Sequence, residues 1–207
     1  FFIGMKTIFV TSFHTLISRN LLQTDFLKLL TKAGHRVVLL VPDYKHGYFF
    51  SEFGSKEVLV GGINTALTLK ELIFRRLGLA LSPTSSLYIK KRSEFYVDKK
   101  LFSFLAAILP AFLFGRSVSA IKILRWAHKI FSSSKTFAKL FDFYKPDLIF
   151  SSDIQNELDI RLMQEGARRG IKSLGMVRSW DNITTKGVIR FVPEKLLVHN
   201  ELIKREA

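Results

Sequence analysis

Side chains able to bind a polar ligand are concentrated between Arg178 and Gly187. This segment holds an indole, a carboxylate, a carboxamide, three hydroxyls and two cations, and an apolar run stands on each side of it. Trp180 could stack on a sugar face or a lipid chain, or it could pack on the core. Asp181 and Asn182 could hydrogen-bond ligand hydroxyls, or they could form an Asx turn that shapes the loop. The density of side-chain chemistry favours a binding loop.

His14 is the candidate general base. The pKa of an unperturbed imidazole, about 6.5, suits proton abstraction at neutral pH, although an ordinary loop histidine is the alternative. Asp153 or Asp181 could orient the ring, and Asp153 could instead be a simple helix N-cap. These three residues are the expected catalytic set.

Cations near these residues could hold a phosphate or carboxylate, with solvated surface charges as the alternative. The expected substrate-binding residues are Arg19, Arg178, Trp180, Asn182, Lys186 and Glu201.

A Rossmann-like α/β domain would bring these residues together. Compact apolar runs rich in β-forming residues predict strands at 6–11, 36–41, 57–60, 147–152, 171–177 and 195–198. Segments with helical spacing separate most of them, and a helix between two strands provides the crossover that parallel pairing requires. The sequence therefore predicts a three-layer fold with a mainly parallel sheet.

Open parallel sheets bind ligands beyond the carboxyl ends of their strands. We expect these ends to converge on one rim, although helix N-caps explain some of the polar residues there. The residues concerned are Ser12 and His14, Asp43 and Tyr44, Ser152 and Asp153, Arg178 to Asn182, and His199 to Glu201.

Residues 65–145 predict a helical, basic segment in the middle of the chain. Lys70 to Lys139 carries 14 Lys and Arg but 3 Asp and Glu, in a chain of net charge +15. This asymmetry indicates an anionic partner, such as a membrane surface or a phosphorylated substrate, or else a solubilising face. Nucleic acid fits less well, because the aromatic residues are mainly Phe at core-like spacing and no RNA or DNA motif is present. The apolar run 101–114 contains Pro110 and is too short to span a bilayer. It predicts either a buried helix or one lying in the membrane interface.

Several kinds of site are excluded or lose support. The absence of Cys excludes disulfides and cysteine-based zinc sites, and the five His residues show no HxxxH or HExxH spacing, so we expect no metal. No GxGxxG or GxxxxGK[ST] follows the first strand, so nucleotide-binding loops of these types lose support. The length fits a single domain, 1–207. Asn200 resembles a helix N-cap about two turns before the end, so we expect the polypeptide to continue.

Three runs resemble a known family. They are Lys6-Thr-Ile-Phe-Val-Thr-Ser-Phe-His14, Gly34-His35-Arg36-Val37-Val38 and Gly175-Met-Val-Arg-Ser-Trp-Asp-Asn-Ile-Thr-Thr-Lys-Gly187. Together they look like the N-terminal, acceptor-side half of a GT-B-type glycosyltransferase. The last run is similar to bacterial surface-polysaccharide proteins and their CDP-glycerol glycerophosphotransferase-like relatives. The helical middle matches no motif of the family.

This resemblance implies two Rossmann-like domains facing across a cleft. The N-terminal domain would take the acceptor, and the nucleotide-activated donor would lie on a C-terminal domain that is missing here, without a metal or other cofactor on this half. The isolated chain is then expected to be inactive. His14 stands where many such enzymes place a general base. A basic and apolar face would suit a lipid-linked acceptor, which predicts a cytoplasmic protein, peripheral on the inner face of the cell membrane.

Three functions follow as hypotheses. The first is the acceptor-binding domain of a glycosyltransferase that passes a nucleotide-activated sugar or polyol phosphate to a cell-surface glycan or lipid-linked acceptor. The second is a sugar-nucleotide epimerase of the same build. The third is a non-catalytic module that binds a membrane or another anionic partner through its basic face.

Overall fold

The computed structural model describes residues 4–99, 101–131 and 135–206. The chain divides into two compact units, each assembled from separate stretches of sequence. Unit 1 comprises Phe1–Ala66, Ser133–Arg178 and Pro193–Leu197, and unit 2 comprises Leu67–Ser132, Ser179–Val192 and Val198–Ala207. The helical segment expected at 65–145 thus falls mostly in unit 2.

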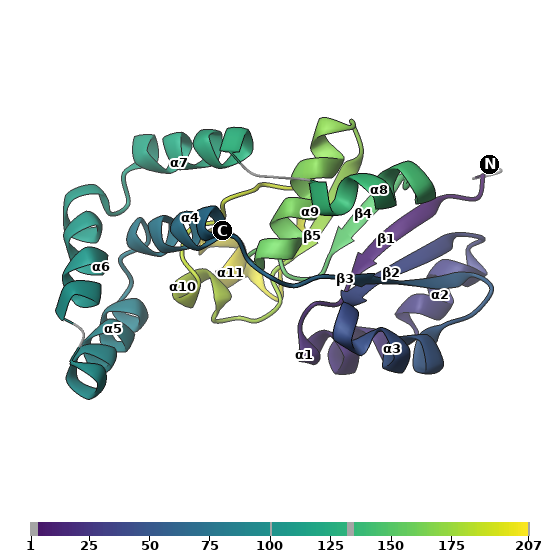
Figure 1. Ribbon diagram of the computed structural model, residues 1–207, viewed down its shortest axis with the longest axis horizontal. Coiled ribbons are helices and arrows are strands. Elements are labelled where there is room, and N and C mark those ends of the chain that lie inside the picture. Colours follow the sequence, from purple (N-terminus) through teal and green to yellow (C-terminus); the bar gives the residue numbers. More distant parts are fainter. Residues whose placement is uncertain (1–3, 100, 132–134, 207) are drawn as a thin grey trace. The chain divides into compact units, whose positions relative to one another are not determined.

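Unit 1 contains a parallel sheet, which is six-stranded over the described residues and has the order β3-β2-β1-β4-β5-β6 (Figure 1). Its strands are β1 (Thr7–Thr11), β2 (Arg36–Pro42), β3 (Val58–Ile63), β4 (Leu148–Ser151), β5 (Lys172–Met176) and β6 (Lys195–Leu197). The order reverses between β1 and β4, which pair directly, with Phe9 opposite Ile149. Such a reversal is the topological switch point of an open α/β sheet, where ligands bind beyond the carboxyl ends of the strands.

Helices cover both faces of this sheet, so the predicted three-layer α/β architecture is confirmed. One face carries α1 (Thr15–Ile17), η1 (Ser18–Leu22), α2 (Phe26–Lys32) and α3 (His46–Phe53), and the other carries α8 (Lys135–Tyr144) and α9 (Glu157–Arg168) (Figure 1). A short 3₁₀ turn, η2 (Asp43–Lys45), links β2 to α3. The run Val37–Val41 is fully buried, as expected for a parallel strand between two helical layers.

The first crossover is not one continuous helix, although its apolar residues between 21 and 30 recur at helical spacing. Ser18–Leu22 forms a π-helical turn, and three turn residues separate it from α2. At the break, Thr24 Oγ1 donates to Leu21 O at 2.6 Å, and Phe26 N donates to Thr24 Oγ1 at 3.3 Å. The threonine side chain takes over backbone groups that a continuous helix would pair, which is how such residues interrupt helices.

Unit 2 is helical over its described residues. Its elements are α4 (Leu69–Ala80), α5 (Ser85–Asp98), α6 (Leu101–Phe114), α7 (Val118–Phe131), α10 (Asn182–Thr185) and α11 (Glu201–Glu206). Thr68 and Glu71 form a capping box at the start of α4, and Thr84 caps α5. These caps satisfy amides that would otherwise lack partners, so they fix where the two helices begin.

The interior of unit 2 surrounds His128 of α7. Its ring lies 4.5 Å from that of Phe74 in α4 and is almost wholly buried. Burial, and then the charge of Arg190, lower the pKa of His128 to about 4. His128 is therefore neutral at pH 7.

The exposure of α6 tests the first of the two alternatives predicted for 101–114, a buried helix or one lying in the membrane interface. Leu101, Leu105, Leu109, Phe112 and Leu113 are all more than half exposed. The alternative of a buried helix is therefore wrong for these side chains. In the part of the chain that the structure describes, no helix has both the length and the hydropathy needed to cross a membrane.

Candidate functional site

The ends of β1 and β4 are joined by hydroxyl groups at the switch point. Thr11 is the last residue of β1, and its Oγ1 accepts from Ser152 N at 2.9 Å and lies 3.0 Å from Ser152 Oγ. Thr11 Oγ1 also donates to Asp159. Because the Thr11 proton is used in that bond, Ser152 is the donor in the hydroxyl pair. Two strand ends are thus locked together by side chains rather than by sheet hydrogen bonds.

Asp159 reaches this point from α9. Its Oδ1 accepts from Ser151 Oγ at 2.9 Å as well as from Thr11, and the residue has no exposed surface. Burial, and then the nearby carboxylate of Asp153, raise the pKa of Asp159 to about 7, although its hydrogen bonds from Thr11 and Ser151 act in the opposite direction. A carboxyl group with this pKa can hold or release a proton at neutral pH.

A buried ion pair joins the next two strand ends. Arg178 follows β5, and its Nη1 lies 3.2 Å from Oδ2 of Asp153, which follows β4; their side chains are 12% and 2% exposed. Asp153 Oδ1 also accepts from Gln155 N at 3.2 Å, while Ile154 N donates to Met176 O. The sequence places both charges at strand ends, and the structure brings them together.

Some buried polar atoms at this end of the sheet have no hydrogen-bond partner among the described residues. They include Ser12 Oγ and Arg178 Nε. Buried polar groups usually have partners, and those that lack one within the protein are open to bonding by water or a ligand. Within unit 1, the switch point therefore combines an ion pair, a carboxyl group with a pKa near neutral and available donors. This cluster, Thr11, Ser12, Ser152, Asp153, Asp159 and Arg178, is called the switch-point site below.

His14 lies just after β1 and caps the first turn of α1. Its Nδ1 accepts from Leu16 N at 3.2 Å. In a neutral imidazole the other nitrogen, Nε2, then carries the proton. His14 Nδ1, the nitrogen that would accept a proton, is used in this hydrogen bond. The ring would therefore have to release Leu16 N before it could act as a base, and this role of His14 stays a prediction.

Asp181, the third expected catalytic residue, belongs to unit 2. Its Oδ1 accepts from Ser179 Oγ at 2.5 Å, and its backbone carbonyl accepts from the hydroxyls of Thr184 and Thr185. Asn182 begins α10 and is buried. These contacts match the local, loop-shaping alternative for Asp181 and Asn182.

The loop is anchored within unit 2 by its backbone. Gly187 has a φ of +83°, and a Cβ there would lie 2.5 Å from Gly78 O, so only glycine fits without displacing α4. Val188 N donates to that same carbonyl at 3.0 Å. Thr84 Oγ1 at the start of α5 donates to Thr184 O at 2.5 Å. The loop 179–187, whose side chains favour a binding loop in the sequence, is therefore held mainly by contacts within unit 2.

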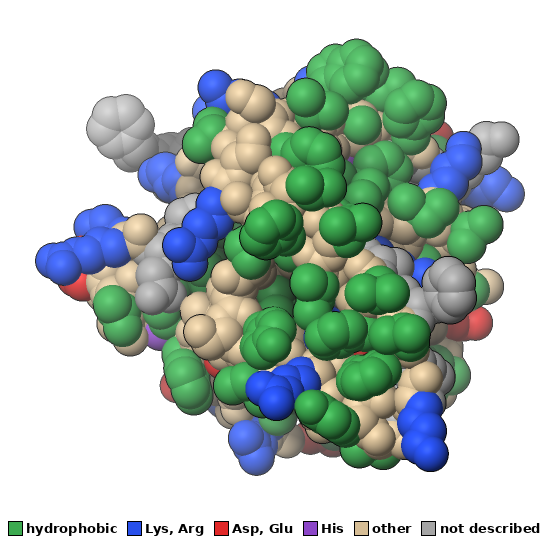
Figure 2. Space-filling model, turned by 90° about the vertical axis from the view of Figure 1, so that its left-hand side faces the viewer, with side chains coloured by type: hydrophobic (Ala, Val, Ile, Leu, Met, Phe, Trp, Pro, Cys, Tyr) green, Lys and Arg blue, Asp and Glu red, His purple; other side chains and the backbone are tan. Residues whose placement is uncertain are grey.

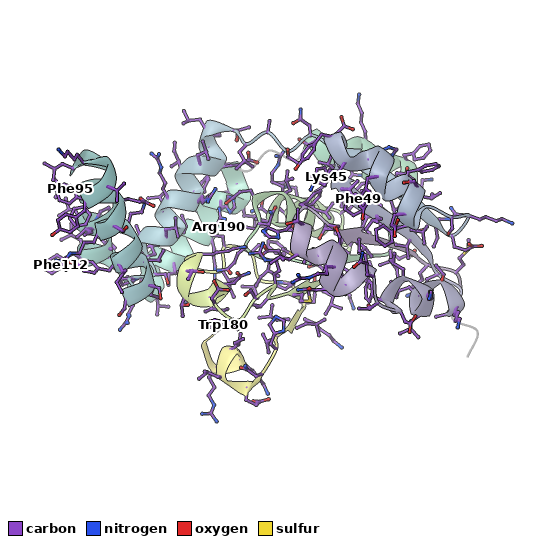
Figure 3. All side chains as sticks on the ribbon, turned by 90° about the horizontal axis from the view of Figure 1, so that it is seen from below. Lys45, Phe49, Phe95, Phe112, Trp180 and Arg190 are labelled. Carbon is purple, nitrogen blue, oxygen red and sulfur yellow. The ribbon has the colours of Figure 1, made fainter. Side chains whose placement is uncertain are left out.

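The remaining predicted binding residues have their own local contacts. Trp180 is 74% exposed (Figure 3), which rules out the alternative that it packs on the core. Arg19 donates to the neighbouring Asn20, and Glu201 pairs with Lys204 one turn along α11. Lys186 ends α10.

Sequence reasoning missed Thr11, Ser151 and Asp159. Asp159 has a detectable signal in the sequence, since the apolar residues Leu162 and Met163 follow it at helical spacing. A carboxylate on the apolar face of a helix is unexpected, because buried charges need partners. A search for that pattern would have selected it.

The described residues contain no group of three or more His, Cys, Asp or Glu able to hold a metal ion. Comparisons of the chain with protein-family models, with curated proteins and with solved structures find no match. The class that the fold defines is therefore a Rossmann-like α/β protein, and its candidate site is the polar cluster at the switch point.

Proposed function

We propose that unit 1 is the acceptor-binding part of a glycosyltransferase-type protein and that its polar acceptor binds at the switch-point site. The observation that carries this proposal is the buried Arg178–Asp153 pair beside Asp159, at the carboxyl ends of three neighbouring parallel strands. Ligands of open α/β sheets bind at this place. The resemblance of the runs around His14 and Arg178 to GT-B-type proteins supports the choice of a glycosyl acceptor.

The roles follow from the chemistry of each group. Arg178 offers a planar guanidinium for a phosphate or hydroxyl of the acceptor, and Asp153 fixes its orientation. Asp159 aligns the hydroxyls of Thr11 and Ser151 by accepting from both. His14 takes the proton of the acceptor hydroxyl as the acceptor oxygen bonds to the donor's glycosyl or polyol-phosphate group, and the bond from that group to the donor's nucleotide breaks so that the nucleotide leaves. The His14 ring leaves Leu16 N to do so.

Ligand binding tests the site without requiring turnover. Arg178→Gln should abolish the thermal stabilisation given by whichever sugar phosphate, nucleotide sugar or CDP-glycerol stabilises the native protein. Arg36→Gln is the matched control, because Arg36 is an exposed arginine at the amino end of β2. The proposal fails if no compound of this set binds, or if Arg178→Gln binds as tightly as the native protein does.

His14→Asn separates catalysis from capping, because asparagine is a good N-cap but not a base at neutral pH. In an assay of transfer to an acceptor with the expected donor domain present, this variant should lose activity while keeping its melting temperature. Unchanged transfer would remove His14 from the mechanism. Conversion of a nucleotide sugar without any acceptor would instead favour the epimerase.

Unit 2 supports the second candidate function, a module that binds an anionic membrane surface. Its helices expose many large apolar side chains, and its segment from Lys70 to Lys129 is rich in cations. Figure 2 shows hydrophobic side chains gathered on the end of unit 2 that carries α5 and α6, with Lys and Arg side chains at its borders. Exposed apolar patches of this kind mark interaction surfaces.

A further inference from the structure

Unit 2 contains a groove between α4, α5 and α6 with a volume of about 1020 Å³. Its lining is mainly apolar and includes Leu79, Leu87, Ile89, Ile108, Ala111 and Phe112. Pockets for small molecules usually measure about 300–1,000 Å³ and are lined by apolar side chains with a few polar groups. The α4–α6 groove is therefore large enough for an extended ligand.

The walls of the α4–α6 groove are fixed by contacts within unit 2. Arg116 N, after α6, donates to Leu81 O, after α4, at 3.1 Å. Phe95 of α5 packs on Phe104 of α6 with ring centroids 5.2 Å apart. Thr84 caps α5 at the edge of the groove. Because each wall is tied to another, the groove exists before any ligand arrives.

Apolar side chains along the groove remain open to solvent. Phe112 of α6 is 84% exposed and Ile89 of α5 is 66% exposed, and both line the groove. Phe95 and Phe112 mark these two helices at the end of unit 2 (Figure 3). Covering such side chains with an apolar chain is favourable in proportion to the area removed from water.

Two cations, Arg76 and Lys91, line the same groove. Lys91 also pairs with Glu94 at 2.6 Å, whereas Arg76 projects from the exposed side of α4. An apolar channel with a guanidinium at its edge matches an amphiphile that has an anionic head. We infer that the α4–α6 groove binds one single-chain lipid phosphate, with the chain along Ile89 and Phe112 and the phosphate at Arg76.

This inference does not rest on the proposed function, because no residue of unit 1 lines the groove. It also differs from adsorption to a membrane surface. A groove of fixed length discriminates between chain lengths and between head groups, whereas a surface patch binds whole bilayers.

Calorimetric titration of the whole protein with saturated lysophosphatidic acids, kept below their micelle concentrations, tests the inference. Affinity should rise about fourfold for each added methylene and then level off when the groove is full. Lysophosphatidylcholine of the same chain should bind more weakly, and inorganic phosphate alone should not bind measurably. The absence of a plateau or of a head-group preference overturns the assignment.

Matched variants locate the ligand. Phe112→Ser combined with Ile89→Ser should weaken binding by at least about tenfold, since it removes two large apolar contacts. Leu113→Ser should change nothing, because Leu113 is also exposed on α6, at 59%, but does not line the groove. All these side chains are mostly exposed, so the variants should keep the native fold, which circular dichroism verifies.

Arg76→Gln should weaken binding of lysophosphatidic acid by about fivefold and leave lysophosphatidylcholine nearly unchanged. Arg75→Gln, at the adjacent exposed position, should leave both unchanged. Equal losses in the Arg75 and Arg76 variants, or in the Leu113 and Phe112 variants, overturn the groove site. Flotation with vesicles of phosphatidylcholine and phosphatidylglycerol that is strong while lysophosphatidic acid fails to bind also overturns it, in favour of adsorption to the bilayer.

Discussion

Unit 1 and unit 2 use apolar and polar residues in opposite ways. In unit 1, Val37–Val41 of β2 is fully buried, and the polar groups at the strand ends are inside and bonded to one another. In unit 2, large apolar side chains such as Phe112 and Trp126 are exposed, while Arg190 and His128 are buried. The arrangement in unit 1 fixes the positions of its polar groups, and the arrangement in unit 2 leaves apolar surface available to a partner.

The largest difference in stability effect between the two units is expected when one phenylalanine in each is replaced by alanine. Phe9→Ala should destabilise unit 1 by about 4 kcal/mol, because Phe9 is fully buried and packs edge-on against Phe141. Phe112→Ala should change stability by no more than about 0.5 kcal/mol. Chemical denaturation followed by circular dichroism measures both. Comparable losses would show that α6 is part of a core.

Removing one half of the buried ion pair should have the next largest effect. Arg178→Ala removes the Arg178–Asp153 ion pair at the strand ends and should cost unit 1 about 3 kcal/mol. Hydrogen exchange should accelerate in β4 and β5 and stay unchanged in α4 and α7. The double variant Arg178→Ala, Asp153→Asn should recover part of the loss. Equal acceleration in both units would contradict their separate stability.

The two units should respond to acid in opposite directions. For His128, the folded pKa of about 4 lies below the unfolded value of 6.5, so its contribution is present above pH 6.5 and is lost as pH falls toward 4. Unit 2 should lose up to about 3 kcal/mol over this window. Both tryptophans lie in unit 2, so fluorescence-detected denaturation follows it. His128→Leu should flatten the dependence, and an unchanged slope would exclude His128 as its source.

Asp159 should give unit 1 the opposite trend. Its pKa is raised from 3.8 to about 7, so its contribution is fully present below pH 3.8 and is lost as pH rises through 7. Asp159→Asn keeps an acceptor for Thr11 and Ser151 but carries no charge. It should stabilise unit 1 at pH 8 by about 2 kcal/mol relative to the native protein and have little effect at pH 4. Hydrogen exchange in α9 measures this, and destabilisation at pH 8 would contradict it.

Much of unit 1 could be predicted because its strands follow from simple patterns. Val37–Val41 is an uninterrupted β-forming run, and the strand predicted at 36–41 is β2, Arg36–Pro42. In unit 2, the sequence of α5 carries no comparable pattern, because its charged and apolar residues do not separate onto two faces of a helix. Its start depends on the Thr84 cap, and its end on the left-handed Lys99.

The candidate site was harder to predict because it depends on contacts between distant residues. Strand-end reasoning found Ser152, Asp153 and Arg178, which lie beyond adjacent strands. It could not find Asp159, which reaches the site from the interior of a helix. It also could not foresee that Ser179 to Val192 groups with α4 and α5 instead of with the sheet, because this depends on the fit of Gly187 against Gly78.

The chain passes between the two units at five points along the sequence. Neither unit is therefore a continuous segment that can be excised. A fragment of residues 67–132 would lack Arg190 beside His128 and the Thr184 carbonyl that pairs with Thr84. Reconstructing unit 1 alone would require new linkers from 66 to 133 and from 178 to 193. For protein engineering, the practical consequence is that separating the site from the groove calls for substitutions in the intact chain, not for truncation.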